Sequence, residues 1–586
     1  MKDTWDLSVL YTGLDDPKYE ADIQAWQDVL GKLHDEVADA AVPCSVEKAE
    51  KLLKLMESSA SLSADLVNFV SLSQSVDTAN GELMAQLNRL MRIYADSAAD
   101  TTGATRLLGS IEDIDAACAE SEMISTYRFA VEDAKKQLKH LLTGPEEALI
   151  AAMDTTGGGA WGNLQSFLTS NVKADYRDQQ LTLSEVRALA YSADASERKD
   201  AYEAELKCYP KIQDSVAFAL NNIKNQVSFL SKKRGYESVL DMTLEQSRME
   251  KRTLDAMLSA IKEYLPAFRR YLRAKAEYLG YKNGLPWYEM FAPMGKSETK
   301  YTVEESRKCL VDVFGKLAPD MAGLMARAFD EEWIDFFPRE GKQGGAFCAA
   351  LSAQKQSRVL TNYDYTFGSV DTLAHELGHA YHDMQVENNA VLNRDYTMPV
   401  AETASTFNEL HLNEQMLSAV PEEERIGLLD SLLRETTQCI VDIYSRFLFE
   451  KAVIERAESE FLMADDLNAL MLECQKASYG DGLDENALCS GMWICKSHYY
   501  SSGISFYNFP YAFGNLFAQG LYALFLERGE AFMADYRNML RLTPVHSMEE
   551  NGSMLGIDLG DTEFWKKSLA HVEKQIDEFC ALCGKE

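Results

Sequence analysis

The sequence HELGH at residues 375–379 constrains the fold more than any other feature of this 586-residue chain. On an α-helix, residues four apart lie one above the other on the same face. His375 and His379 could therefore reach one metal ion, with Glu376 beside it. Because the chain has only nine histidines, such a motif arises by chance on the order of once in a hundred such sequences. We therefore predict a helix that carries a metal site at 375–379.

The residues around the motif are compatible with a helix. Ser369 is a candidate N-cap, and Asp371 would bring negative charge into the first turn, where the helix dipole favours it. The apolar side of the helix would consist of Leu373, Ala374, Leu377, Ala380 and Tyr381. The alternative is a surface helix with two solvated histidines, and the scarcity of histidine argues against it.

Two imidazoles make half of a tetrahedral zinc site, and a catalytic site takes one further protein ligand and leaves the fourth position to water. The candidate third ligand is Glu402, 23 residues beyond His379. Pro399 marks the start of a new helix, which places Glu402 in an early turn and Glu409 on the same side two turns later. From the residues alone Glu402 is a weak candidate, because an acidic residue in a first turn is usually present for the helix dipole. The roles of Glu409 and His382 stay open, and His382 suits either a contact near the metal or an ordinary buried histidine.

Four blocks of sequence carry a resemblance to a known family. They are WDLS followed by LY at residues 5–11, TLAHELGHA at 372–380, ETASTF at 402–407, and HYY at 498–500 followed by FYNFPY at 506–511. In these blocks the chain resembles the oligoendopeptidase F family of zinc metallopeptidases, relatives of thimet oligopeptidase, over nearly its whole length. The resemblance implies that His375, His379 and Glu402 bind one zinc ion per chain and that Glu376 is the catalytic base.

The last of these blocks is expected to face the substrate, since in the family a histidine and tyrosines from this block do so. His498 matches the histidine, and Tyr507 and Tyr511 are the expected tyrosines. A donor such as His498 or Tyr507 would stabilise the oxyanion of a tetrahedral intermediate. The alternative is a buried aromatic helix, because four phenylalanines recur at helical spacing: Phe506, Phe509, Phe513 and Phe517.

A zinc site with an adjacent glutamate has a definite chemistry. Zinc lowers the pKa of water and polarises a carbonyl, while Glu376 takes the water proton and passes it to the leaving amine. We therefore expect a zinc-dependent endopeptidase, by the resemblance an oligopeptidase that cleaves short peptides. The alternatives are a zinc carboxypeptidase or dipeptidase, and a non-catalytic zinc-stabilised protein that binds peptides. Glu376 argues against the last, because structural zinc sites have four protein ligands and need no base.

Helical patterns dominate the chain, so the expected fold is mainly α: a large multi-helical zincin peptidase with a small β-sheet beside the HExxH helix. The β-prone run 358–363 is the clearest strand signal near the motif. Before it, Gly344 and Gly345 either let a backbone approach a ligand or form a turn. We place the boundary between a helical N-terminal region and the peptidase region near 190, giving 1–190 and 191–586. By the resemblance, residues 1–190 roof a deep substrate channel.

The composition narrows the partners and the location. The net charge of −34 disfavours nucleic acid and anionic membranes. The chain starts without an apolar leader and lacks a run of 18 apolar residues, so we expect a cytoplasmic protein. Eleven scattered cysteines, including Cys580 and Cys583 near the end, fit reduced thiols better than a disulfide framework. Peptide preference and oligomeric state do not follow from the sequence.

Overall fold

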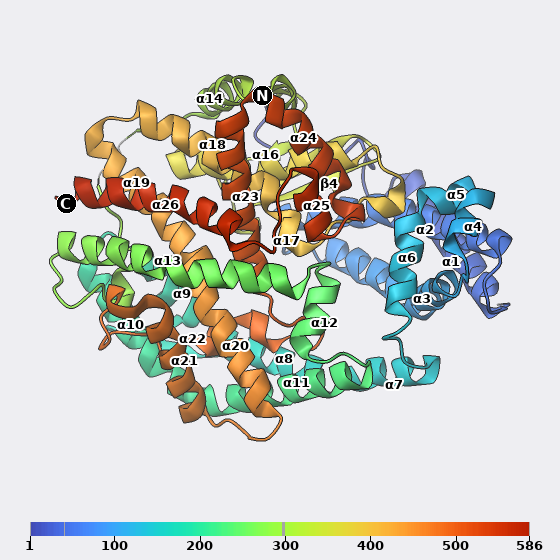
Figure 1. Cartoon of the computed structure of the whole chain (residues 1–586), viewed down its shortest axis with the longest axis horizontal. Helices are drawn as coiled ribbons and strands as arrows, with labels where there is room; N and C mark the ends of the chain where they lie inside the picture. Colours follow the sequence, from blue (N-terminus) through green and yellow to red (C-terminus); the bar gives the residue numbers. More distant parts are fainter. Residues whose placement is uncertain (1, 40, 296–298, 585–586) are drawn as a thin grey trace.

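The computed structural model describes residues 2–39, 41–295 and 299–584. Helices make up most of it, so the predicted mainly α class is confirmed (Figure 1). The helices before residue 172 are α1 (Pro17–Ala38), α2 (Val46–Val76), α3 (Gly81–Gly109), α4 (Ile114–Glu120), α5 (Glu122–Thr126), α6 (Arg128–Gln137), α7 (Gly144–Asp154) and α8 (Gly158–Asn171).

The remaining helices come before and after the HELGH motif in the sequence. Those before it are α9 (Leu183–Ala188), α10 (Ala195–Cys208), α11 (Gln213–Lys233), α12 (Val239–Gln246), α13 (Lys251–Tyr278), α14 (Val303–Gly315) and α15 (Pro319–Asp330). The motif helix and those after it are α16 (Phe367–Val386), α17 (Met398–Ala401), α18 (Thr403–Ala419), α19 (Glu422–Thr437), α20 (Ile443–Ala457), α21 (Ala464–Tyr479), α22 (Met492–Cys495), α23 (Phe509–Arg528), α24 (Glu530–Leu542), α25 (Met548–Met554) and α26 (Thr562–Leu582).

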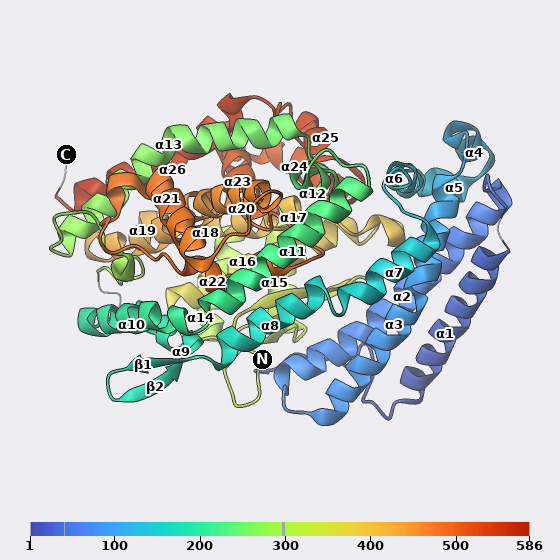
Figure 2. The ribbon, with the colours of Figure 1, turned by 90° about the horizontal axis from the view of Figure 1, so that it is seen from below.

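Helices α1–α6 lie at one end of the molecule, and we call them the N-terminal limb. In Figure 2 the three long helices α1–α3 lie side by side. Each of them begins at a side chain suited to capping: Asp16, Ser45 and Asn80 accept hydrogen bonds from amides of the first turn. The apolar residues of the limb form two buried clusters, one that contains Leu52 and one that contains Phe69.

A three-stranded sheet lies beside the motif helix, as predicted. Its order is β3 (Ile334–Asp335), β5 (Gln356–Leu360) and β4 (Phe347–Leu351), with β3 parallel and β4 antiparallel to β5. The paired part of β5 begins two residues before the predicted run 358–363 and ends at Leu360. The order makes β4 an edge strand. A separate hairpin pairs β1 (Lys173–Tyr176) with β2 (Gln179–Thr182).

Both faces of the three-stranded sheet are packed, because successive strand residues point to opposite sides. Val359 belongs to the large apolar cluster that includes α16, whereas the next residue, Leu360, belongs to the limb cluster that contains Phe69. Leu351 of β4 joins the same limb cluster. Asn68 of α2 also donates from Nδ2 to a backbone carbonyl of β4, that of Ala350, at 3.0 Å. The strands thus connect the limb to the motif helix.

The N-terminal WDLS block is fastened to this sheet. Phe336 N donates to the carbonyl of Asp3 at 3.0 Å, and Arg358 Nε donates to the carbonyl of Asp6 at 2.7 Å. Trp5 is buried in the limb cluster that contains Phe69. The first residues of the chain therefore tie the limb to the strands.

Gly344 and Gly345 form a turn before β4. Gly345 has a φ of +83°, which favours glycine, and its carbonyl accepts a hydrogen bond from Asn362 Nδ2 at 2.8 Å. A Cβ at either glycine would meet no atom within 4 Å. The positive φ of Gly345 fits the turn interpretation, and the approach of a ligand backbone to these glycines stays a prediction.

The motif helix α16 lies in the large apolar cluster and packs against α18, α24 and the strands β4 and β5. The predicted apolar face is fully buried: Leu373, Ala374, Leu377, Ala380 and Tyr381 are each at most 1% exposed. This burial fixes the rotation of α16 and so decides where the motif histidines point.

The division near residue 190 stays a prediction. The limb clusters draw on residues up to 134, together with Leu351 and Leu360 of the sheet. The large cluster begins at Ala174 and runs to Phe579. Residues between these limits include α7 and α8, which join the limb to the rest of the chain (Figure 2).

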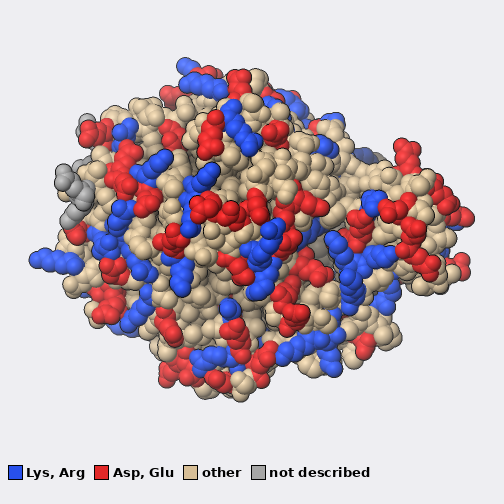
Figure 3. All heavy atoms as spheres, viewed as in Figure 1, with Lys and Arg blue, Asp and Glu red and all other residues tan. Residues whose placement is uncertain are grey.

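Acidic and basic side chains alternate over much of the face seen in Figure 3. Acidic residues gather at the limb end, where α4 and its flanks contain Glu112, Asp113, Asp115, Glu120 and Glu122. In the part of the chain that the structure describes, no helix is long and apolar enough to cross a membrane. All eleven cysteines are unpaired.

Candidate active site

The start of α16 differs from the prediction. Thr366, not Ser369, is the N-cap, and its hydroxyl accepts a hydrogen bond from the backbone amide of Ser369. The Ser369 hydroxyl donates instead to Asp364 Oδ1 at 2.7 Å. Because the helix begins earlier, Asp371 lies beyond the first turn, and it accepts a hydrogen bond from Asn413 Nδ2 of α18 at 3.0 Å. The predicted N-cap role of Ser369 and the predicted first-turn position of Asp371 were therefore wrong.

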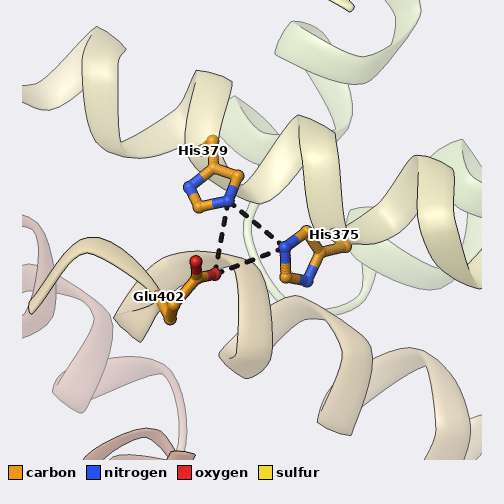
Figure 4. Close-up of side chains that lie close together, drawn as sticks. All are labelled: His375, His379 and Glu402. Carbon is orange, nitrogen blue, oxygen red and sulfur yellow. Dashed lines mark hydrogen bonds and ion pairs between the residues drawn. The ribbon is translucent and has the colours of Figure 1, made fainter. Parts of the chain in front are cut away.

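His375, His379 and Glu402 come together as one cluster (Figure 4). His375 Nε2 lies 3.2 Å from His379 Nε2 and 3.3 Å from Glu402 Oε2, and His379 Nε2 lies 3.4 Å from the same carboxylate oxygen. Ligand atoms about 2.0–2.1 Å from a tetrahedral zinc ion would be about 3.3 Å apart. The two nitrogens and the oxygen therefore have the spacing of three vertices of a zinc tetrahedron.

Glu402 reaches the histidines from the junction of two helices. Pro399 lies in the single turn α17, and α18 begins at Thr403, so Glu402 sits between them and not inside one helix as predicted. Ser405 donates from Oγ to Glu402 Oε2 at 2.9 Å, which fixes the carboxylate. On the other side, α23 comes close because Gly514 has no side chain: a Cβ there would lie 3.1 Å from Glu402 Cβ.

Gly378, inside the motif, lets α16 touch α18. A Cβ at this position would lie 2.5 Å from Ser405 Cα and 2.7 Å from the carbonyl oxygen of Ala404. These are backbone atoms and cannot rotate away. The glycine of HELGH therefore sets the distance between the helix that carries both histidines and the helix that follows Glu402.

Glu409 orients the first histidine. Its Oε1 lies 3.0 Å from His375 Nδ1, while His375 Nε2 points toward the cluster with Glu402. A carboxylate on the second ring nitrogen fixes the tautomer and ring orientation of a metal-binding histidine. Burial disfavours protonation of His375, but Glu409, with Glu402 and Glu376, outweighs it and raises the pKa of His375.

Glu376 lies beside the cluster and is not one of its three grouped residues. It is 6% exposed, and burial raises the pKa of its carboxyl. Glu376 and His375 line a cavity of about 390 Å³. Asp371 and Glu409 line the same cavity, as does Glu435 from α19, which no motif in the sequence marks. The cavity beside the motif is thus rich in carboxylates.

The last of the four sequence blocks, residues 498–511, is the late block, and it forms an aromatic group around His498. The His498 ring lies 5.0 Å from the Tyr507 ring and 6.1 Å from the Tyr511 ring, and the two tyrosine rings are 5.5 Å apart. Burial lowers the pKa of His498, and Arg446 and Lys496 add to this effect, so its imidazole favours the neutral form.

This aromatic group lies next to the turn that precedes Glu402. Tyr507 Oη lies 3.6 Å from Met398 Sδ in α17, the turn before Glu402. Burial raises the pKa of Tyr511, as do its hydrogen bond with Tyr507 and the charge of Glu402. The predicted residues His498, Tyr507 and Tyr511 thus lie together on the Glu402 side of the cluster.

The aromatic-helix interpretation holds for other residues of the block. Phe509, Phe513 and Phe517 are fully buried on α23. Phe506 is also buried, but it precedes the helix and has a φ of +53°. The block therefore supplies both core and site side chains.

His382 is an ordinary buried histidine. It is fully buried, its Nε2 lies 2.8 Å from Thr543 Oγ1, and its ring stacks on Tyr396 at 4.0 Å. Burial lowers its pKa to about 3. It does not belong to the His375 cluster.

Two family models and several known proteins match this chain. The Peptidase family M3 model matches residues 320–571, and the Oligopeptidase F model matches residues 110–173. The chain is 22% identical to Oligopeptidase PepF of Bacillus subtilis, with 100% of this chain and 88% of that protein aligned. It is 25% identical to an oligoendopeptidase F homolog of Lactococcus lactis over 99% of this chain and 97% of that protein. The crystal structure of oligoendopeptidase-F from Enterococcus faecium shares the fold, with a TM-score of 0.72 at 16% identity, covering 96% of this chain and 100% of the other.

Proposed function

We propose that this chain, which matches the Peptidase family M3 model over residues 320–571, is a zinc-dependent endopeptidase that hydrolyses internal bonds of short oligopeptides. One observation carries the proposal: His375, His379 and Glu402 place three ligand atoms 3.2–3.4 Å apart, with Glu376 adjacent. We also propose that the enzyme acts on peptides in the cytoplasm. Its net charge of −34 supports the further proposal that it binds neither nucleic acid nor anionic membranes.

The donor set suits one zinc ion per chain. Two imidazoles and one carboxylate are a common catalytic zinc set, and a three-ligand site leaves a position for water. Glu409 supplies the carboxylate partner that such a histidine usually has. When bound, zinc would act as a Lewis acid that polarises the scissile carbonyl and lowers the pKa of water toward about 7.

The chain's own residues move the protons. Glu376 accepts the proton of the attacking water and later gives it to the leaving amine. Its raised pKa favours this exchange, because a carboxyl with a pKa closer to the working pH both takes up and releases a proton readily. His498 and Tyr507 donate hydrogen bonds to the developing oxyanion, and loss of one such donor costs about 3–4 kcal/mol of transition-state stabilisation.

The substrate backbone has a place to bind. The outer edge of β4, where Asn68 occupies the Ala350 carbonyl, offers its other main-chain N–H and C=O groups to an extended peptide, which gives affinity without requiring one particular side chain. This mode suits an enzyme that accepts many short peptides.

The test combines zinc content with cleavage of an internally quenched nonapeptide blocked at both ends. We compare the wild type with Glu376→Gln, and with Glu387→Gln at the end of α16 as a matched control. We expect one zinc per chain in all three proteins and hydrolysis in all but Glu376→Gln. Cleavage only after a terminus is unblocked would indicate a carboxypeptidase or dipeptidase. Zinc without hydrolysis in the wild type would contradict the proposal.

A further inference from the structure

A fully buried ion pair lies next to the chain segment that carries Tyr507. Lys224 of α11 and Glu450 of α20 are 0% and 1% exposed, and Lys224 Nζ lies 2.7 Å from Glu450 Oε1. Taking two charges out of water is costly, and their attraction compensates for it only with good geometry and further hydrogen bonds. The partners of the Glu450 carboxylate therefore indicate what the pair does.

Both further hydrogen bonds of Glu450 go to one loop. The Phe506 amide donates to Glu450 Oε1 at 3.0 Å, and Asn508 Nδ2 donates to Glu450 Oε2 at 2.8 Å. Asn508 in turn accepts, through Oδ1, a hydrogen bond from the Phe509 amide at the start of α23. Glu450 thus holds the residue before Tyr507 and the residue after it.

This loop has a conformation that needs external support. Phe506 has a φ of +53°, a region that is unfavourable for a residue with a bulky side chain and persists only where the surroundings determine it. The Phe506 side chain is buried against Phe447, with ring centroids 5.5 Å apart. Among residues 505–510, Tyr507 alone is not buried. Its neighbours are fixed inward, so its own ring is presented toward His498.

We infer that Lys224 and Glu450 are positioning residues that hold Tyr507 against His498 for catalysis. The inference rests on the proposed function, because it concerns the residues proposed to stabilise the oxyanion. Lys224 keeps a carboxylate, with two acceptor oxygens, opposite two donors of the loop. Glutamine at 450 has one acceptor oxygen, and its NH₂ group would face a donor. A small misplacement of a catalytic group can lower the rate by about 100-fold.

The test is Glu450→Gln, with Glu289→Gln as the matched control. Glu289 is also fully buried, paired with Arg198 at Nε (3.0 Å) and bonded by Tyr281 Oη (2.8 Å). We expect Glu450→Gln to lower kcat about 10- to 100-fold with zinc content and KM nearly unchanged. We expect Glu289→Gln to lower only the Tm.

A second readout does not depend on activity. Hydrogen–deuterium exchange of the metal-free protein should show faster exchange of amides in residues 501–510 in Glu450→Gln but not in Glu289→Gln, because the Phe506 amide loses its acceptor. If Glu450→Gln does not fold, the double variant Lys224→Met and Glu450→Met removes both charges and keeps the volume. It should fold and show the same fall in kcat.

A double-mutant cycle with Tyr507→Phe decides the mechanism. If Glu450 acts through Tyr507, adding Glu450→Gln to Tyr507→Phe should lower kcat by less than about twofold more. Multiplying losses, unchanged exchange in 501–510, or unchanged kcat in Glu450→Gln would each overturn the inference. Wild-type protein that cleaves no peptide would instead contradict the proposed function, and the exchange result would then stand as a purely structural effect and overturn the catalytic role.

Discussion

Gly378→Ala is the substitution for which the geometry gives the sharpest expectation. The added Cβ would lie 2.5 Å from Ser405 Cα, whereas carbon atoms in contact prefer about 3.5–4.0 Å. Relief requires α16 and α18 to separate by about 1 Å. His375 and His379 move with α16 and Glu402 with the start of α18, while zinc ligands tolerate displacements of about 0.2 Å.

We therefore expect a weaker metal site and a less stable fold. Zinc affinity should fall at least about tenfold, equivalent to about 1.4 kcal/mol. Overpacking should lower the free energy of unfolding of the metal-free protein by about 1–3 kcal/mol. The first effect is measured by competition with a chelator of known zinc affinity, and the second by chemical denaturation.

Gly323→Ala on α15 is the control. A Cβ at Gly323 would meet no atom within 4 Å, and alanine is the better helix former by about 1 kcal/mol. It should leave zinc affinity unchanged and stability equal or slightly higher. Wild-type zinc affinity and stability in Gly378→Ala would refute the argument that this glycine sets the helix spacing.

Three further predictions concern Glu409, Tyr507 and His382. Glu409→Gln should lower zinc affinity about 10- to 100-fold by loosening His375, as measured by chelator competition, and unchanged affinity would remove Glu409 from that role. Tyr507→Phe should lower kcat about 100-fold or more with zinc retained, and unchanged turnover would exclude Tyr507 as an oxyanion donor. His382 stays neutral in the folded protein, where its pKa is about 3, but takes up a proton in the unfolded chain below pH 6.5. The stability that it contributes is therefore complete above pH 6.5 and declines as the pH falls toward 3. Between pH 7 and pH 5 the wild type should thus lose about 2 kcal/mol more unfolding free energy than His382→Phe, and equal losses in denaturation experiments at the two pH values would contradict this assignment.

The sequence was sufficient for the motif helix and its buried face, because periodic apolar residues and HELGH both require the same helical spacing. It was not sufficient for the cap. Thr366 and Ser369 are both good N-caps three residues apart, and Asp364, which engages the Ser369 hydroxyl, decides between them. Such a choice depends on the path of the chain before the helix, which local pattern does not reveal.

The supporting residues of the site were beyond sequence reasoning for a different reason. Lys224 and Glu450 are 226 residues apart, and neither belongs to a motif. The spacing of the late phenylalanines suggested a helix through Phe506, yet the helix starts at Phe509. The bonds that hold Phe506 outside it come from Glu450, so the break is a tertiary effect.

The sheet that joins the limb to the motif helix links the position of the edge strand β4 to that of the limb. Pulling α2 away from β4 and β5 would bring Leu351, Leu360 and Phe69 into water, at about 1.5–3 kcal/mol for each side chain. A movement of the limb would therefore move the edge strand β4 with it. Under the proposed function, a limb movement that admitted a peptide would also shift the β4 edge that aligns the peptide with His375. Entry and alignment of the substrate would then share one barrier.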